Sequence, residues 1–544
     1  FDNGAVCAPT RSSWITGMHS ISNGTQPMRS GFEIPATISF YNELLQKAGY
    51  FTSNCSKTDY NLRAPSGRNP KDFWNYSGKD YAGTWKKRKE GQPFFTVYNI
   101  GDSHESRAFG DHKDESVDPE EMILAPYHPD LPEMRNTYAK YASAISRMDS
   151  LVGQAIENLK QDGLYENTII VYNSDHGGVL ARSKRFLYSS GIHCPLIVRI
   201  PEKMKALYPK GKTPGSTMDR IVSFIDMPKT WVSLTGAEMK DQFQGRIFLG
   251  PNTEPESQYH FSWRERADER FDNVRVMRDK QFAYHKNYAP FAPNGQYLAY
   301  MHNMKATGAW ERHHLAGKTN AVTGRFFEPR PSEEFYDNFK DFHNIDNQID
   351  DPLHQTKIKE LKKELRRQQL KYFDSGLMPE EMRNRIIKEK NTTVYDFVRD
   401  PKLYPLAQYL DYSDLALTRK KKNLKTFTKG LADEDPVKRY WSVIGLLLLE
   451  KQAKPAIPEL KKVLGDRDEI PAFAAWAIYK AGEKTFAEKW MLEAITQNPG
   501  NKTLANIFDW MGTASHSLLA KIPSDKLPQK GLLKDVIKRS GVQN

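Results

Sequence analysis

The chain has 544 residues, of which 39% are hydrophobic, so it is long enough to bury a large core and too apolar to be generally disordered. The net charge of +12 favours a polyanionic partner, but the short lysine clusters lack interleaved aromatic residues, which argues against nucleic acid. The longest apolar run covers residues 443–449, too short for a membrane span, and three cysteines give no disulfide framework.

Residues 1–255 alternate short β-rich runs with helical patterns, which is typical of an α/β domain. We expect buried strands over residues 94–100, 168–172 and 195–200. Apolar residues recur at steps of three and four over residues 133–159, which predicts a long helix between the first two strands. We expect these two strands to be parallel, joined by a right-handed crossover.

The composition changes in the second half of the chain. Residues 256–390 are rich in aromatic and charged residues, with strands expected over residues 274–277 and 281–285 and a charged helix after them. We assign residues 391–424 to a linker, and residues 425–544 to helices whose spacing resembles HEAT-type repeats. The predicted fold is therefore an α/β domain with a large mixed sheet flanked by helices, a smaller C-terminal sheet subdomain and an appended helical-repeat domain.

The most informative stretch is residues 7–17, which read Cys-Ala-Pro-Thr-Arg-Ser-Ser-Trp-Ile-Thr-Gly. It resembles the activation motif of the type I sulfatases of the alkaline phosphatase superfamily, in which the cysteine is oxidised to formylglycine. The resemblance implies that the hydrated aldehyde formed from Cys7 attacks sulfur and that Arg11, which keeps its charge at any working pH, holds it. Taken alone, the stretch also fits a buried cysteine before a Pro-containing first helical turn.

Further stretches match the family in the expected order. Asp175 and His176 follow the strand predicted at residues 168–172, and the resemblance assigns them, with Cys7, to a Ca²⁺ site, with Mg²⁺ as the alternative cation. A carboxylate suits a hard cation, whereas imidazole is less usual for calcium. The two adjacent aspartates that complete the family's metal site occur at no suitable strand end, and we expect them upstream of Phe1.

The resemblance also assigns residues around the sulfate group. Lys57 and Lys184 match two sulfate-binding lysines, and their charges would stabilise the departing sulfate. His104 matches the histidine that protonates the leaving alcohol, a role that suits imidazole because its pKa lies near neutrality. Asp59 stands where the family usually has a histidine, and we assign it to substrate binding, either through a substrate hydroxyl or by orienting Lys57.

The substrate side follows from the extent of the match, which covers about residues 1–350 and is closest to bacterial polysaccharide sulfatases related to the heparan N-sulfatase. Arg264, Asp268 and Arg270 precede the strand predicted at residues 274–277, and we assign them to substrate binding. A solvated charged surface explains these three residues equally well.

The leading hypothesis is a sulfatase that removes sulfate from the O- or N-sulfate groups of a polysaccharide or its oligosaccharides. The resemblance implies a formylglycine-generating maturation enzyme as a second partner and a periplasmic or secreted location in a bacterium, with the signal segment not present in this chain. Two alternatives stay open. One is a phosphoester hydrolase of the same superfamily, and the other is a catalytically decayed protein that binds sulfated glycans, which Asp59 and the missing aspartate pair favour.

Overall fold

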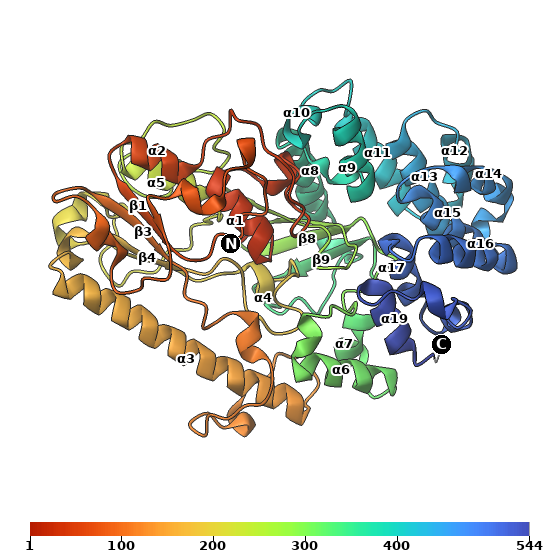
Figure 1. Cartoon of the computed structure of the whole chain (residues 1–544), viewed down its shortest axis with the longest axis horizontal. Coiled ribbons are helices and arrows are strands. Elements are labelled where there is room, and N and C mark those ends of the chain that lie inside the picture. Colours follow the sequence, from red (N-terminus) through yellow and green to blue (C-terminus); the bar gives the residue numbers. More distant parts are fainter. Residues whose placement is uncertain (543–544) are drawn as a thin grey trace.

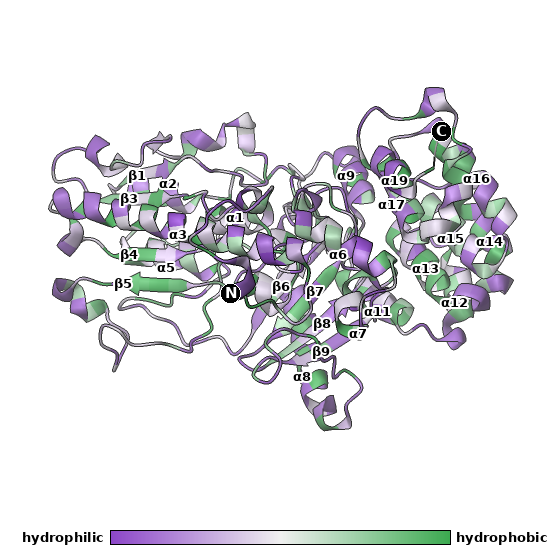
Figure 2. Ribbon diagram, turned by 90° about the horizontal axis from the view of Figure 1, so that it is seen from below, coloured by the Kyte–Doolittle hydropathy of each residue, from purple (hydrophilic) through white to green (hydrophobic). Residues whose placement is uncertain are grey.

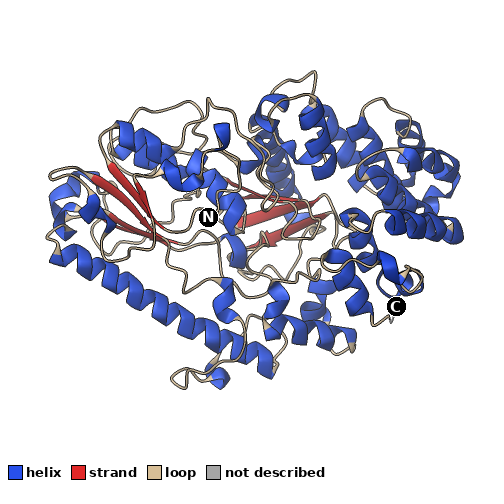
Figure 3. Ribbon diagram, viewed as in Figure 1, coloured by secondary structure: helices blue, strands red, loops and turns tan. Residues whose placement is uncertain are grey.

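The structure is a computed structural model that describes residues 1–542. Its strands lie in two groups, which Figure 3 shows in red, and the C-terminal helices lie beyond the second group. In Figure 1 the N-terminus and α1 (Cys7–Thr16) lie between the two groups of strands. The first residues of the chain are therefore placed where the α/β part meets the second sheet.

The first group contains a parallel three-stranded sheet in the order β2-β1-β3 and an antiparallel pair, β4-β5. The bounds are Phe51–Cys55 (β1), Tyr76–Ser77 (β2), Phe94–Tyr98 (β3), Ile170–Asn173 (β4) and Leu196–Arg199 (β5). The three strands predicted from apolar runs in this half of the chain are confirmed. Figure 2 shows β4 and β5 in green, in keeping with their apolar sequences.

The predicted long helix is present as α3 (Pro132–Gln161), a helix of 30 residues that runs along the first group of strands in Figure 1. The strands on either side of it, predicted to be parallel, belong to different ladders, so no ladder joins them. Within residues 1–542, β3 pairs with β1 and β4 pairs with β5, so the two strands share no ladder. Helical periodicity predicts the connecting helix, but it carries no information about which strand lies beside which.

Three helices anchor the first residues of the chain. The helices α1, α2 (Tyr41–Lys47) and α5 (Asp226–Leu234) pack against one another, and buried apolar side chains from all three belong to one core cluster. A short fourth helix, α4 (Ser189–Ile192), precedes β5. The packing of α1 on two other helices fixes the position of Cys7 at its start.

The second sheet is antiparallel, in the order β6-β7-β8-β9, and confirms the predicted sheet subdomain. Its strands are His260–Arg264 (β6), Val274–Arg278 (β7), Phe282–Asn287 (β8) and Glu333–Asp337 (β9). The helices α6 (Lys305–Leu315) and α7 (Ala321–Gly324) lie between β8 and β9 in the chain, and the predicted charged helix is α8 (Gln355–Lys371). Because α8 packs against β7 and β8, it covers one face of this sheet, and Ala5, Leu187 and Ile192 pack against Val274, Val276 and Ala283 in a separate buried cluster.

The rest of the described chain, up to residue 542, is helical. The helices are α9 (Glu380–Glu389), α10 (Val394–Phe397), α11 (Leu406–Leu417), α12 (Leu424–Gly430), α13 (Pro436–Leu449), α14 (Ile457–Lys462), α15 (Ile470–Ala481), α16 (Lys484–Gln497), α17 (Lys502–Met511), α18 (His516–Leu519) and α19 (Leu532–Ser540). Residues 391–424, assigned to a linker, instead form helices that share a core with α13, because α11 carries apolar residues that pack against it. No helix among residues 1–542 is long and apolar enough to cross a membrane.

The helical region is joined to the second sheet by an aromatic cluster and an ion pair. Phe271 and Phe291, near the sheet, lie with ring centroids 5.7 and 5.4 Å from that of Phe473 in α15. The buried Arg270 places Nη1 3.1 Å from an oxygen of Asp509 in α17. The two parts therefore share buried contacts.

Candidate active site

Cys7 is the first residue of α1 and is buried. The N-terminus of a helix carries partial positive charge, which favours a thiolate there. The helix ends at Gly17, which has φ of 67° and whose missing Cβ would lie 2.1 Å from a ring atom of Phe243. The last position of the motif therefore requires glycine, for its backbone conformation and for the space that Phe243 occupies.

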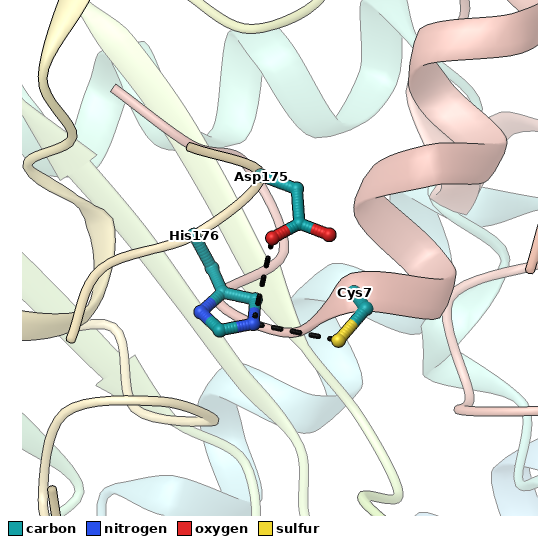
Figure 4. Close-up of side chains that lie close together, drawn as sticks. All are labelled: Cys7, Asp175 and His176. Atoms are coloured by element: carbon teal, nitrogen blue, oxygen red, sulfur yellow. Dashed lines mark hydrogen bonds and ion pairs between the residues drawn. The ribbon is translucent and has the colours of Figure 1, made fainter. Parts of the chain in front are cut away.

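Cys7 meets two residues from the loop after β4, as Figure 4 shows. Its Sγ lies 3.4 Å from Nε2 of His176, and that nitrogen lies 3.6 Å from Oδ1 of Asp175. One donor atom from each of the three residues lies within 4.8 Å of the other two. The structure therefore brings together the three side chains predicted to form a metal site.

Two predicted cations flank the carboxylate of Asp175. Lys57 Nζ lies 3.3 Å from Asp175 Oδ2, and Arg11 Nη1 lies 3.8 Å from the same oxygen. Arg11 also donates hydrogen bonds of 2.8 Å to the carbonyl oxygens of Thr58 and Lys57. Arg11 thus orients the backbone that carries Lys57 and contributes charge to the site.

The charges of this cluster shift the ionisation of its members. Burial alone would raise the pKa of the Cys7 thiol, but the Lys184 ammonium and a hydrogen bond with His104, among other contacts, hold it well below its usual range. Burial likewise opposes ionisation of Asp175, but neighbouring cations, led by Lys57, hold the pKa of this carboxyl well below its usual value. The site therefore favours a negatively charged Cys7 and Asp175 among fixed positive charges.

His104 caps a short 3₁₀ turn after β3, and its hydrogen bonds indicate the tautomer of its neutral ring. The backbone N–H of Ser106 donates to Nδ1 of His104 at 3.3 Å, and the hydroxyl oxygen of Ser106 lies 3.0 Å from the same nitrogen. Because Nδ1 accepts from the backbone, the proton of the neutral ring lies on Nε2. That nitrogen is then able to donate a proton to a leaving oxygen.

Lys184 is buried, and its Nζ lies 3.0 Å from Oε2 of Glu105. The other oxygen of Glu105 lies 2.7 Å from Nη1 of Arg185. Neither Glu105 nor Arg185 was predicted as a site residue. A glutamate that follows a histidine carries no recognisable pattern, so only the fold reveals these contacts.

Asp59 adopts a left-handed backbone conformation, with φ of 48°, and its side chain is half-buried. Burial and the negative charge of Cys7 raise the pKa of Asp59, whereas Lys57 and Arg29 oppose this effect. The charges of Cys7 and Lys57 thus act on Asp59 in opposite directions. A strained conformation of this kind is common at functional sites.

The three residues assigned to the substrate side have different environments. Arg264 is buried with Nη1 2.9 Å from Asp272, and Arg270 is buried and paired with Asp509. Both guanidinium groups are therefore buried and paired with carboxylates, and the assignment of these two arginines to substrate binding stays a prediction. Asp268 is partly accessible, and one of its oxygens lies 2.8 Å from Nε of Arg185.

Cys7, Asp175 and His176 together could supply only part of the ligand shell that calcium prefers. Calcium takes about six to eight oxygen ligands, and this set offers one carboxylate, one imidazole and one sulfur. One oxygen of Asp175, Oδ2, also pairs with Lys57. Asp175 is thus the one member of the set whose chemistry suits calcium well.

Comparison with known proteins identifies related chains. Residues 1–237 match the protein-family model described as Sulfatase. An ulvan-active sulfatase from Formosa agariphila is 32% identical over 456 residues, which cover 74% of this chain and 73% of the relative. An N-acetylglucosamine-6-O-sulfatase from Bacteroides thetaiotaomicron is 33% identical over 131 residues, 23% of this chain and 22% of the relative. A solved structure in complex with its substrate D-glucosamine-2-N,6-O-disulfate has a TM-score of 0.47 and 17% identity, and the match covers 70% of this chain and 91% of that one.

Proposed function

Because the chain belongs to the sulfatase family, we propose that it hydrolyses the sulfate groups of a sulfated polysaccharide or its oligosaccharides, with Cys7 at the reacting position. The observation that carries this proposal is the meeting of Cys7, His176 and Asp175, flanked by Lys57, within the matched region. Two relatives are named for ulvan and for N-acetylglucosamine-6-O-sulfate, which supports a carbohydrate substrate.

The cations of the site would bind and stabilise sulfate. Lys57, Lys184 and Arg11 are held by buried or partly buried carboxylates and carbonyl oxygens, so little reorganisation is needed when negative charge develops on the sulfate oxygens. Preorganised charges of this kind act more strongly in a site that excludes water than they do in solution. In this proposal Asp59 binds a hydroxyl of the sugar or orients Lys57.

His104 would act as the general acid. Its Nδ1 accepts a hydrogen bond from the Ser106 N–H, so its Nε2 carries the proton that the leaving alcohol requires. Proton donation matters most for a sugar alcohol, because an alkoxide is a poor leaving group.

We propose that Cys7 is converted to formylglycine by a maturation enzyme. The hydrated aldehyde supplies one hydroxyl that attacks sulfur and a second whose deprotonation releases sulfate. The residues around Cys7 suit this group, because Lys184, His104 and His176 all favour negative charge at the position of the Cys7 side chain. Arg11 would keep the backbone that carries Lys57 in place, because it donates hydrogen bonds to the carbonyl oxygens of Thr58 and Lys57.

A calcium ion is part of the same proposal, with magnesium as the alternative. Asp175 and His176 would hold the cation, which acts as a Lewis acid on a sulfate oxygen when bound. The periplasmic or secreted location and the HEAT-type character of residues 425–544 are also proposals. The side-by-side packing of α13 with α15 and of α15 with α16 supports the second of these.

The decisive experiment combines peptide mass spectrometry across Cys7 with measurement of sulfate release. Conversion of the thiol to the aldehyde replaces CH2SH by CHO and so lowers the mass by about 18 Da. Oxidation of this kind is selective for one cysteine, so the loss can be assigned to one peptide. We expect this loss in protein from its natural host, together with release of sulfate from a sulfated polysaccharide and slower release of phosphate from aryl phosphate. Faster phosphate release would favour a phosphoester hydrolase, and glycan binding without turnover would favour a decayed protein.

A further inference from the structure

Glu105 is a fully buried carboxylate that lies between two positive charges from consecutive residues. One of its oxygens lies 2.7 Å from Nη1 of Arg185, and the other lies 3.0 Å from Nζ of Lys184. Glu105, Lys184 and Arg185 all have side chains exposed by 3% or less. A buried carboxylate shared in this way is costly to leave unpaired, so the three side chains hold one another in place.

Arg185 is the fixed member of this group. Its Nε lies 2.8 Å from Asp268, and its backbone N–H donates a hydrogen bond of 2.6 Å to the carbonyl oxygen of Ala5. Its backbone has φ of 79°, a conformation that a non-glycine residue adopts only when its surroundings impose it. Because Arg185 is held on several sides, it fixes one oxygen of Glu105 and leaves the other for Lys184.

The position of Glu105 in the chain connects this group to the site. It directly follows His104 in the short turn after β3, and the segment of Lys184 is hydrogen-bonded to the segment of Cys7, since the N–H of Arg185 donates to the carbonyl oxygen of Ala5. The Lys184 ammonium also lowers the pKa of the Cys7 thiol. Glu105 therefore connects the segment of His104, the proposed general acid, to the segment of Lys184, a proposed sulfate-binding residue. Nothing in the sequence motifs assigns a role to it.

We propose that Glu105 is the positioning residue for Lys184. Its carboxylate holds the buried ammonium of Lys184 in place near Cys7 and neutralises part of that positive charge until sulfate binds. This inference rests on the proposed sulfatase function. Glu105 takes no part in bond making or breaking. Its effect is to keep Lys184 in the place where charge develops during sulfate release.

The test compares three variants on one sulfate ester. Glu105→Gln keeps the shape and removes the charge, so we expect kcat to fall by about 10- to 100-fold, the cost of a small misplacement. We expect KM to stay the same or fall, because the Lys184 charge becomes fully available to sulfate. Glu105→Asp keeps the charge on a shorter side chain and should lose less than Glu105→Gln. It also keeps the proposal testable if the glutamine variant does not fold.

Glu265→Gln is the matched control. Glu265 is also a buried glutamate between two arginines, with Arg275 at 3.1 Å and Arg383 at 3.0 Å, and it contacts none of the residues around Cys7 given above. We expect a comparable loss of thermal stability and unchanged kcat. Equal kinetic constants in the Glu105→Gln and Glu265→Gln variants, or a raised KM with intact kcat for Glu105→Gln, would overturn the positioning role.

A separate readout distinguishes failure of this inference from failure of the proposed function. If the unaltered enzyme releases no sulfate from any ester, the proposed function fails, and titration with inorganic sulfate by calorimetry becomes the measurement. Glu105→Gln should then bind sulfate at least as tightly as the unaltered protein. Weaker sulfate binding in this variant would show that Glu105 does not neutralise part of the Lys184 charge.

Discussion

Cys7 Sγ lies 3.4 Å from Nε2 of His176, although 169 residues separate the two in the chain. The contact joins the start of α1 to the loop after β4, and the carboxylate of Asp175 lies next to it. The predicted reacting side chain therefore sits at the edge of the predicted metal site, within reach of the same groups that would bind sulfate.

Replacing Cys7 by alanine should abolish turnover with little effect on folding. The change removes only the sulfur atom, and with it any hydroxyl nucleophile that modification could create, so we expect sulfate release to fall by at least about 10³-fold. Sulfate release and the thermal midpoint should be measured on the same preparation. Full activity in the alanine variant would disprove the assignment of Cys7.

Replacing Asp175 by asparagine should remove the response to calcium. The substitution keeps the shape but removes the one carboxylate among the three clustered donors, so we expect added Ca²⁺ to raise the thermal midpoint of the unaltered protein and leave that of the variant unchanged. The control is Asp59→Asn, which removes a neighbouring carboxylate outside this cluster. An equal calcium response in both variants would contradict the site.

Replacing His104 by alanine should lower the rate of sulfate release, and the loss should be larger for a more basic leaving group. Loss of a general acid costs about 10²- to 10⁴-fold when the leaving alcohol needs a proton. We expect a loss of this size for a sugar sulfate and a loss of less than about tenfold for nitrophenyl sulfate, whose phenolate leaves unaided. Equal losses on both substrates would argue that His104 positions the substrate without donating a proton.

A carboxylate far from the site predicts a pH dependence of stability. Burial, followed by the nearby charge of Glu381, raises the pKa of Glu469 to about 8. Between the ordinary value of 4.5 and about 8, the folded protein keeps a proton that the unfolded chain releases, so this group lowers stability as the pH rises. We expect Glu469→Gln to gain a few kcal/mol relative to the unaltered protein on going from pH 5 to pH 8.5, at about 1.4 kcal/mol per unit of pKa shift.

Urea unfolding at these two pH values measures the difference. Glu434→Gln, on the exposed surface of the same helical region, serves as the control. A constant difference between the Glu469→Gln variant and the unaltered protein at both pH values would show that Glu469 ionises normally in the folded state.

Removing residues 425–544 should lower stability and solubility more than it changes the chemical step. The deletion removes Asp509 and Phe473, leaving the buried Arg270 without its ion pair and Phe271 and Phe291 without their aromatic partner. The subtler Arg270→Ala change should cost about 3 kcal/mol in unfolding free energy, because Asp509 keeps a second partner in Arg539. A stable truncated protein that has lost turnover would contradict this expectation.

Local patterns allowed the sequence to predict much of the fold. The periodicity of α3, the apolar runs of the strands and the motif that begins at Cys7 are all contained in neighbouring residues, and the structure has each element where it was predicted. The partners of β3 and β4, which are β1 and β5, could not be predicted, because pairing depends on segments far apart in the chain.

The site shows the same limit. Asp175 and His176 follow a predicted strand and could be found by motif, whereas Glu105 has a role only through its contact with Lys184. Arg264 was assigned to substrate binding, with a solvated surface as the alternative, and only the fold reveals that it is buried with Asp272 as its partner. Burial of charge thus depends on long-range contacts that no short motif records.

The pair of Arg270 and Asp509 also affects how the protein is made. Arg270 leaves the ribosome long before Asp509 does, so the turn between β6 and β7 carries an unpaired guanidinium and an uncovered Phe271 until Phe473 and Asp509 have been synthesised. Such a nascent chain is prone to aggregate and to bind chaperones. Codon changes that slow translation between residues 270 and 509 should therefore lower the yield of soluble protein more than equal changes placed before residue 270.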